Sequence, residues 1–108
     1  MLSLLGGLCS CSSLFTKDSP QRDKATQAQM GRLVHEVRND LDEHHRLYRA
    51  GHHSQAKSPL IQAQRNCERA LVLAQSLSPS VPSRAESIAI TQSVLDDIRA
   101  LRAERYFS

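Results

Sequence analysis

The sequence predicts a small all-α protein, an antiparallel helical bundle of about three helices that follows a flexible apolar N-terminal tip containing cysteine. Three observations support this fold class. Only two Phe and two Tyr occur among 108 residues, with no Trp, so a core must be built from aliphatic side chains, which suit helices better than sheets. Apolar residues recur at alternating steps of three and four. Proline and serine are concentrated between these periodic stretches.

We expect two segments, a flexible membrane-anchoring segment at residues 1–18 and one helical bundle domain at residues 19–108. A body of about 90 residues is near the lower size at which one hydrophobic core suffices. Its core is rich in alanine and therefore marginal in stability. Self-association or a partner is consequently expected.

The first helix is predicted at about residues 20–50. Ser19 and Pro20 form a start signal, because serine caps an early N–H and proline at the first helical position loses no needed donor. Gly51 supplies a stop, while Gly31 in the interior costs about 1 kcal/mol relative to alanine. The helix is longer than the other two, so an overhang could pair with a second copy as a homodimer. Its predicted apolar face comprises Met30, Val34, Val37, Leu41, His44 and Tyr48.

Two further helices follow with short connections, which predict an up-down-up arrangement. Ser58 and Pro59 predict the start of the second helix, and the prolines of SLSPSVPS end it. Ser83 and Glu86 have the spacing of a capping box at the start of the third helix. The second apolar face comprises Leu60, Ala63, Cys67, Leu71, Ala74 and Leu77. The third comprises Ile88, Thr91, Leu95, Ile98 and Leu101.

The stretch LYRAGHHSQAKSPLIQA resembles the middle of a tetratricopeptide repeat, with Gly51 at the turn and Ala56 and Ala63 at small-residue positions. It covers about half of one repeat, and no second copy follows at the period of about 34 residues. We favour a plain helical hairpin, because Pro59 would fall inside the second helix of a repeat.

No catalytic, metal or cofactor site is predicted, and an enzyme is not expected. Adjacent histidines on a helix point about 100° apart, so neither His44 with His45 nor His52 with His53 chelates a metal unaided. A polar helix end with a partly buried His44 is the favoured interpretation. Cys67 lies on an apolar face, where a thiol behaves as a small hydrophobe.

The charge is mildly basic, with a formal net charge of +3, and it supports an alternative function. Arg46 and Arg49 end the first helix, and Arg65 and Arg69 lie one turn apart on the second. The end of the third helix carries Arg99, Arg102 and Arg105. A dimer that aligned these arginines could bind the backbone of double-stranded RNA. In size, charge and helical architecture the chain is similar to small dimeric viral suppressors of RNA silencing of the nodavirus type. That similarity includes no matched motif, so no residue role is carried over.

The opening stretch MLSLLGGLCSCSSLF has no charged residue. It is shorter than the roughly 20 apolar residues of a membrane span, and Leu2 excludes myristoylation. S-acylation with palmitate at Cys9 and Cys11 fits, because two acyl chains anchor stably where one binds marginally. Two alternatives remain open: a disordered terminus that carries no acyl chain, and a bacterial lipoprotein lipidated at Cys11.

These observations predict a non-enzymatic accessory or adaptor protein on the cytosolic face of a membrane. The N-terminus would bind the membrane surface, and the bundle would bind a protein partner whose identity the sequence does not reveal. The alternative is a dimeric RNA-binding protein.

Overall fold

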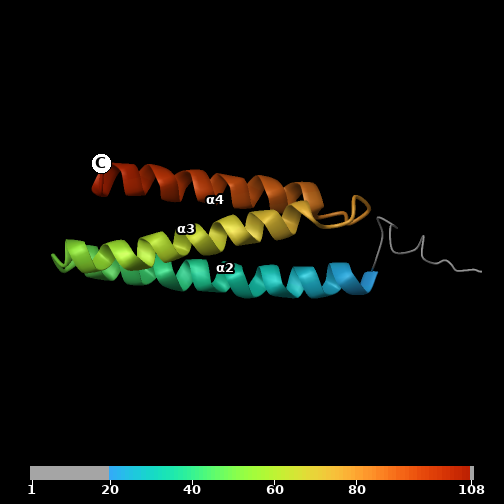
Figure 1. Cartoon of the computed structure of the whole chain (residues 1–108), viewed down its shortest axis with the longest axis horizontal. Coiled ribbons are helices and arrows are strands. Elements are labelled where there is room, and N and C mark those ends of the chain that lie inside the picture. Colours follow the sequence, from blue (N-terminus) through green and yellow to red (C-terminus); the bar gives the residue numbers. More distant parts are fainter. Residues whose placement is uncertain (1–19, 108) are drawn as a thin grey trace, which may run out of the picture.

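The computed structural model describes residues 20–107, which form three helices: α2 (Pro20–Arg49), α3 (His53–Gln75) and α4 (Arg84–Arg105). The helices run up, down and up, with α3 between the other two (Figure 1). The predicted all-α class and three-helix bundle are confirmed. The predicted tip at residues 1–18 lies outside the described residues.

A narrow seam of small side chains joins α2 to α3. Residues of α3 are buried at alternating steps of four and three, which places them on one face of the helix. Four of them are alanines that are 0–1% exposed, so the two helices can approach closely. This seam comprises Ala56, Leu60, Ala63, Cys67, Ala70 and Ala74 on α3, facing Met30, Leu33, Val37 and His44 on α2.

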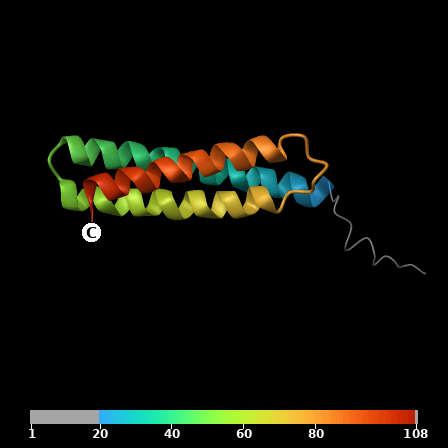
Figure 2. The ribbon, with the colours of Figure 1, turned by 90° about the horizontal axis from the view of Figure 1, so that it is seen from above.

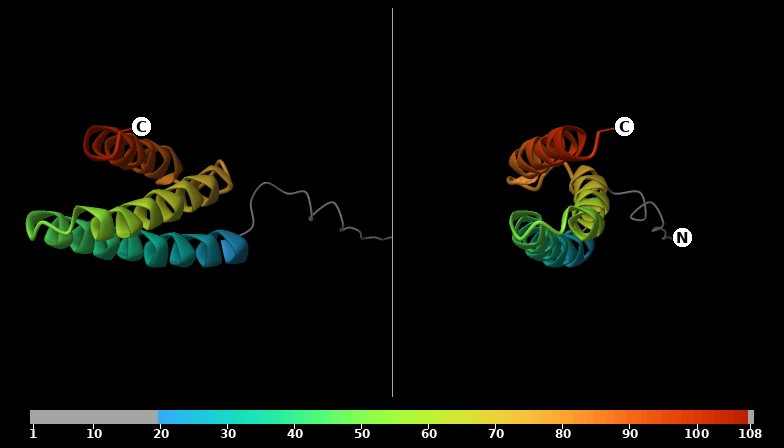
Figure 3. Two further views of the ribbon diagram at one scale, coloured as in Figure 1. Left: turned by 60° about the vertical axis from the view of Figure 1, so that its left-hand side comes forward. Right: turned by 90° about the vertical axis from the view of Figure 1, so that its left-hand side faces the viewer.

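The third helix packs on α3 and not along α2. The main core cluster joins Leu95 and Ile98 of α4 to Leu60 and Cys67 of α3, and Val37 reaches it from α2. Within residues 20–107 the backbones of α2 and α4 make no close approach, although each packs along α3. Seen from above, α4 runs obliquely across the other two helices (Figure 2). The end-on view shows α3 on one side between α2 and α4 (Figure 3).

The start of α3 differs from the prediction. The helix begins at His53, so Ser58 and Pro59 lie inside it. Gly51 adopts φ 89°, a conformation that suits glycine, and the turn is closed by the His52 N–H donating to Leu47 O at 2.9 Å. Because α3 begins before the predicted start, its first turn includes Ala56, which is completely buried against α2. This packing compensates for the backbone hydrogen bond that Pro59 cannot donate.

The predicted capping box of α4 does not form. Ser83 is the N-cap residue, as predicted, but its ψ of 4° is not extended and its side chain makes no cap hydrogen bond. The side chain of Arg84, the first residue of α4, contacts the end of α3. Its Nε donates to Leu77 O and its Nη2 donates to Gln75 O, both at 2.9 Å. Arg84 therefore caps the exposed carbonyl end of α3.

The predicted uncovered overhang of α2 is wrong, because the connection between α3 and α4 covers it. Asp23 is buried, and its Oδ1 accepts a hydrogen bond from the Ser78 backbone N–H at 3.1 Å. Arg22 donates to Ser76 O at 3.4 Å. The first turn of α2 is thus hydrogen-bonded to the loop that follows the C-terminal end of α3.

The predicted apolar face of α2 is partly wrong. Val34 is 43% exposed, and Leu33, which was not predicted, is 4% exposed. Because α2 packs along α3 and not along α4, its buried face is narrower than a helix with two neighbours would need. Val34 consequently lies beside the core rather than in it.

Candidate binding surfaces

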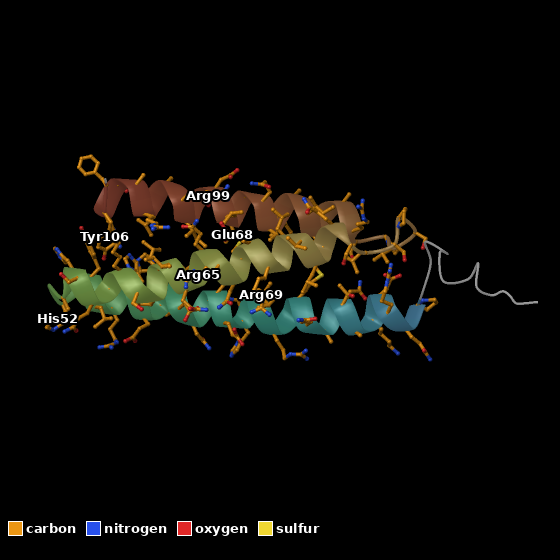
Figure 4. All side chains as sticks on the ribbon, viewed as in Figure 1. His52, Arg65, Glu68, Arg69, Arg99 and Tyr106 are labelled. Atoms are coloured by element: carbon orange, nitrogen blue, oxygen red, sulfur yellow. The ribbon has the colours of Figure 1, made fainter. Side chains whose placement is uncertain are left out.

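The predicted site residues fall into three places. Cys9 and Cys11 lie outside the described residues. Arg65 and Arg69 are exposed near the middle of α3, one turn apart (Figure 4). Arg46 and Arg49 lie in the last turn of α2, at the end of the bundle. Arg65 is twelve residues into α3, which is about 18 Å along the helix axis from this end. The structure therefore separates the two predicted arginine pairs.

The Arg46 side chain is engaged with a carboxylate. Its Nη2 lies 2.6 Å from Glu43 Oε2 and its Nε donates to Oε1 at 3.0 Å. The hydrogen bond from Arg46 lowers the pKa of Glu43 below its usual value. This two-point contact reduces what Arg46 can offer a phosphate.

An apolar groove lies between α2 and α4, and we call it the α2–α4 groove. Its floor is formed by Cys67 and Ala70 of α3, and it encloses about 70 Å³. Its walls are formed by Val34, Val37, Ile90, Thr91 and Val94. Val34 and Ile90 are 43% and 56% exposed, which is high for large aliphatic side chains. The groove therefore presents apolar surface that no described part of the chain covers.

Cys67 belongs to the core, as its position on the apolar face predicted. It is 2% exposed, and its Sγ–H donates to Thr91 O at 3.5 Å. Burial raises the pKa of the Cys67 thiol; Glu68 raises it further, and Arg99 opposes both. The reactive thiolate is thus disfavoured at this position.

A second cavity lies on the other side of α4, between α3 and α4, and we call it the α3–α4 cleft. It has a volume of about 420 Å³ and is lined by Lys57, Gln64, Arg99, Arg102, Ala103, Tyr106 and Phe107. None of these lining residues is acidic. Arg99 and Arg102 were predicted to lie at an arginine-rich helix end, but a cleft that joins them to Lys57 and to the aromatic residues was not predicted. The adjacent aromatic residues after this helix end were the available signal.

His44 organises the end of the bundle where α2 meets α3. It is fully buried, not partly buried as predicted. Its Nδ1 lies 2.8 Å from Ala56 O and its Nε2 lies 2.7 Å from Arg105 Nη1. A carbonyl only accepts and a guanidinium only donates, so in this geometry His44 Nδ1 donates to Ala56 O and His44 Nε2 accepts from Arg105. Arg105 also lies over the Tyr48 ring, 4.0 Å from its centroid.

His45 lies next to this cluster and is half-buried. Burial lowers the pKa of His45, and the nearby His44, Arg105 and Arg49 lower it further, whereas Asp42 acts in the opposite direction. Within residues 20–107, no three His, Cys, Asp or Glu side chains gather closely enough to hold a metal ion.

None of the three described helices combines the length and the apolar character that crossing a membrane requires. Comparisons with protein-family models, with curated proteins and with solved structures find no match to this chain.

Proposed function

We propose that this chain is a non-enzymatic accessory or adaptor protein that binds an amphipathic helix of a partner protein in the α2–α4 groove. S-acylation of Cys9 and Cys11 would hold it on the cytosolic face of a membrane. The observation that carries the proposal is the exposed apolar groove between two helices that both pack on a third. A helix seated there would bury Val34 and Ile90 and complete a four-helix arrangement.

Gly31 supports a helix as the occupant. It lies one turn before Val34 on the same face of α2, and a Cβ placed on it would meet nothing within 4 Å. No close contact within the described chain therefore requires glycine here, although glycine weakens a helix interior by about 1 kcal/mol. A glycine does allow another backbone to approach closely.

The charges beside the groove indicate the chemistry of the partner helix. Arg38 lies one turn beyond Val34 on α2, and Asp97 lies one turn beyond Val94 on α4, and both are exposed. A partner helix with an apolar stripe, acidic residues toward α2 and basic residues toward α4 would match both sides. Charge complementarity of this kind sets orientation and specificity more than affinity.

Site-directed photo-crosslinking in cells tests the groove. A photoreactive residue at Val34 or Ile90 should join the chain to one discrete partner, which mass spectrometry of the crosslinked peptide then identifies. Val72 is the matched control, because it is a valine of similar size on α3 that is 62% exposed and lies outside the groove. Equal crosslinking from Val72, or products that contain only a second copy of this chain, would contradict a partner helix.

The membrane tether rests on Cys9 and Cys11, one residue apart in an uncharged stretch. Two acyl chains bury enough CH₂ groups, at roughly 0.8 kcal/mol each, for stable anchoring. Labelling with an alkyne analogue of palmitate, removable by hydroxylamine, should mark the full chain and should be lost in Cys9→Ser/Cys11→Ser. Full-length protein should fractionate with membranes, whereas a chain beginning at Ser19 should not. An unlabelled wild type would rule out the tether.

The exposed pair Arg65 and Arg69 favours a second candidate, a dimer that binds double-stranded RNA. Both arginines lie on the outer side of α3, where Arg99 of α4 is also seen (Figure 4). A gel shift with duplex RNA should show salt-sensitive binding that Arg65→Ala/Arg69→Ala weakens. Arg46→Ala/Arg49→Ala is the matched control at the separate arginine pair, and an equal effect of the two double variants would count against a specific site.

A further inference from the structure

The α3–α4 cleft concentrates positive charge. Lys57, Arg99 and Arg102 line it, and within the described residues one of these three cations forms an ion pair, between Arg99 Nη2 and Glu68 Oε2 at 3.3 Å. Arg102 donates from Nη1 to Gln64 Oε1 at 3.0 Å. Each guanidinium has five N–H donors, so most donors in the cleft remain available. Three cations outnumber one carboxylate, and the cleft is suited to an anion.

Two aromatic rings lie beside these cations. Tyr106 is held in place because its hydroxyl donates to His53 O at 2.7 Å, and Lys57 Nζ lies 5.7 Å from the centre of its ring. Phe107 follows directly and is 76% exposed, the highest value among the large apolar residues that the structure describes as exposed. Nothing in the described core accounts for an aromatic ring in this position. A planar ligand group could stack on it.

We propose that the α3–α4 cleft binds a nucleotide unit. Arg99, Arg102 and Lys57 bind its phosphate, and its base stacks on Phe107 beside Tyr106. A cationic groove beside an exposed aromatic ring, here Phe107, is the chemistry by which proteins bind single-stranded nucleic acid, because every base has a face that can stack. A free nucleotide offers the same chemistry. The site is separate from the α2–α4 groove and does not depend on the proposed adaptor function.

The aromatic rings distinguish this ligand from other anions. Inorganic phosphate or a lipid headgroup would use the cations and gain nothing from stacking on Phe107. A duplex keeps its bases paired and stacked within the helix, so it also offers no free base to the ring. A substitution of Phe107 therefore separates a nucleotide from these ligands, because the ring is exposed and carries no charge.

Fluorescence polarisation with the full chain tests the proposal. The probe is a labelled single-stranded RNA of about ten nucleotides, which is within the site sizes of single-strand binders. Phe107→Ala should weaken binding at least about fivefold, which corresponds to the lower range for the loss of a stacking ring. Arg99→Gln/Arg102→Gln should weaken binding and reduce its salt dependence by about one ion per lost contact. Glu68→Gln should strengthen binding, because it frees Arg99.

Lys24→Gln/Arg32→Gln is the charge-matched control, because it also removes two positive charges and both residues are exposed on α2, outside the α3–α4 cleft. Circular dichroism checks that each variant keeps its helical content. AMP as a competitor distinguishes the two sources: displacement by AMP assigns a free nucleotide, and displacement only by the single strand assigns nucleic acid. Either result supports a site that binds a phosphate through cations and stacks a base on Phe107.

Three results would overturn the proposal. The first is an effect of Lys24→Gln/Arg32→Gln as large as that of Arg99→Gln/Arg102→Gln, which would indicate non-specific charge attraction. The second is tighter binding of duplex RNA, which would favour the Arg65 and Arg69 surface. The third is binding to phosphatidylserine vesicles or to inorganic phosphate with no effect of Phe107→Ala. A variant of Val34 should leave RNA binding unchanged, so this test and the test of the groove can fail independently.

Discussion

Replacing His44 by leucine should destabilise the chain, because leucine retains much of the volume and cannot form either hydrogen bond. His44 is fully buried, with 2.8 Å to Ala56 O and 2.7 Å to Arg105 Nη1. A hydrogen bond between neutral groups contributes about 1 kcal/mol, and one to a charged group contributes about 1.5–3 kcal/mol. The free energy of unfolding should therefore fall by about 3 kcal/mol. For a domain of this size, this lowers the melting midpoint by roughly 12–24 °C.

His35 provides the control, because it is also a histidine on α2 and it is exposed. His35→Leu should change the free energy of unfolding by less than about 0.5 kcal/mol. Urea unfolding, followed by far-UV circular dichroism at one fixed pH, measures both variants. If His44→Leu were no more destabilising than His35→Leu, the buried hydrogen bonds would not hold this end of the bundle together. Arg105→Met should account for part of the same loss, and the double variant should show less than additive destabilisation.

Three further predictions concern other parts of the bundle. Gly31→Ala should raise the free energy of unfolding by up to about 1 kcal/mol in urea titrations, since helix propensity improves and nothing lies within 4 Å of the new methyl group; a decrease would show a contact that the structure lacks. Asp23→Ala should lower it by about 1–2 kcal/mol, because the buried Ser78 N–H loses its acceptor; Asp42→Ala, exposed on the same helix, serves as control. Stability should also fall as pH decreases below about 6.5, because the lowered pKa of His45 means that the unfolded chain takes up this proton first. The contribution of His45 to the free energy of unfolding is complete above about pH 6.5 and is lost as pH falls toward the pKa of His45 in the folded chain. His45→Gln should therefore show a shallower fall in stability with decreasing pH, and a pH profile unchanged by this substitution would contradict the prediction.

Local signals predicted both ends of α2 and the start of α4. Pro20 and Gly51 bracket α2, and Ser83 precedes α4, because a proline or a cap acts within one helical turn and is readable in sequence. A serine followed by a proline did not mark the start of α3, because Ser58 and Pro59 lie inside that helix. There, burial of Ala56 against α2 outweighs the preference of proline for a first turn, and such burial depends on the partner helix rather than on neighbours in the chain.

The candidate surfaces were less predictable, because they depend on which helices pack together. An apolar repeat does not reveal whether a helix has one neighbour or two, so Val34 was assigned to the core and Leu33 was missed. Each arginine pair is spaced by about one helical turn, which gave the two pairs equal weight, although the hairpin places them at different positions along the bundle axis. The α3–α4 cleft joins residues 57 and 107, a separation over which periodicity carries no information.

The backbone of α4 packs on α3 and not on α2, and its contacts with α2 are made by side chains such as Arg105 with His44. Loss of these side-chain contacts would let α4 detach without opening the bundle as a whole. If α4 detached, the hairpin of α2 and α3 would retain its seam, and Cys67 would be the thiol uncovered, since Thr91 of α4 covers it. In a chain whose Cys9 and Cys11 have been replaced by serine, the rate at which a thiol reagent modifies Cys67 would measure this opening. The modification rate of Cys67 would thus report how often α4 detaches from α3.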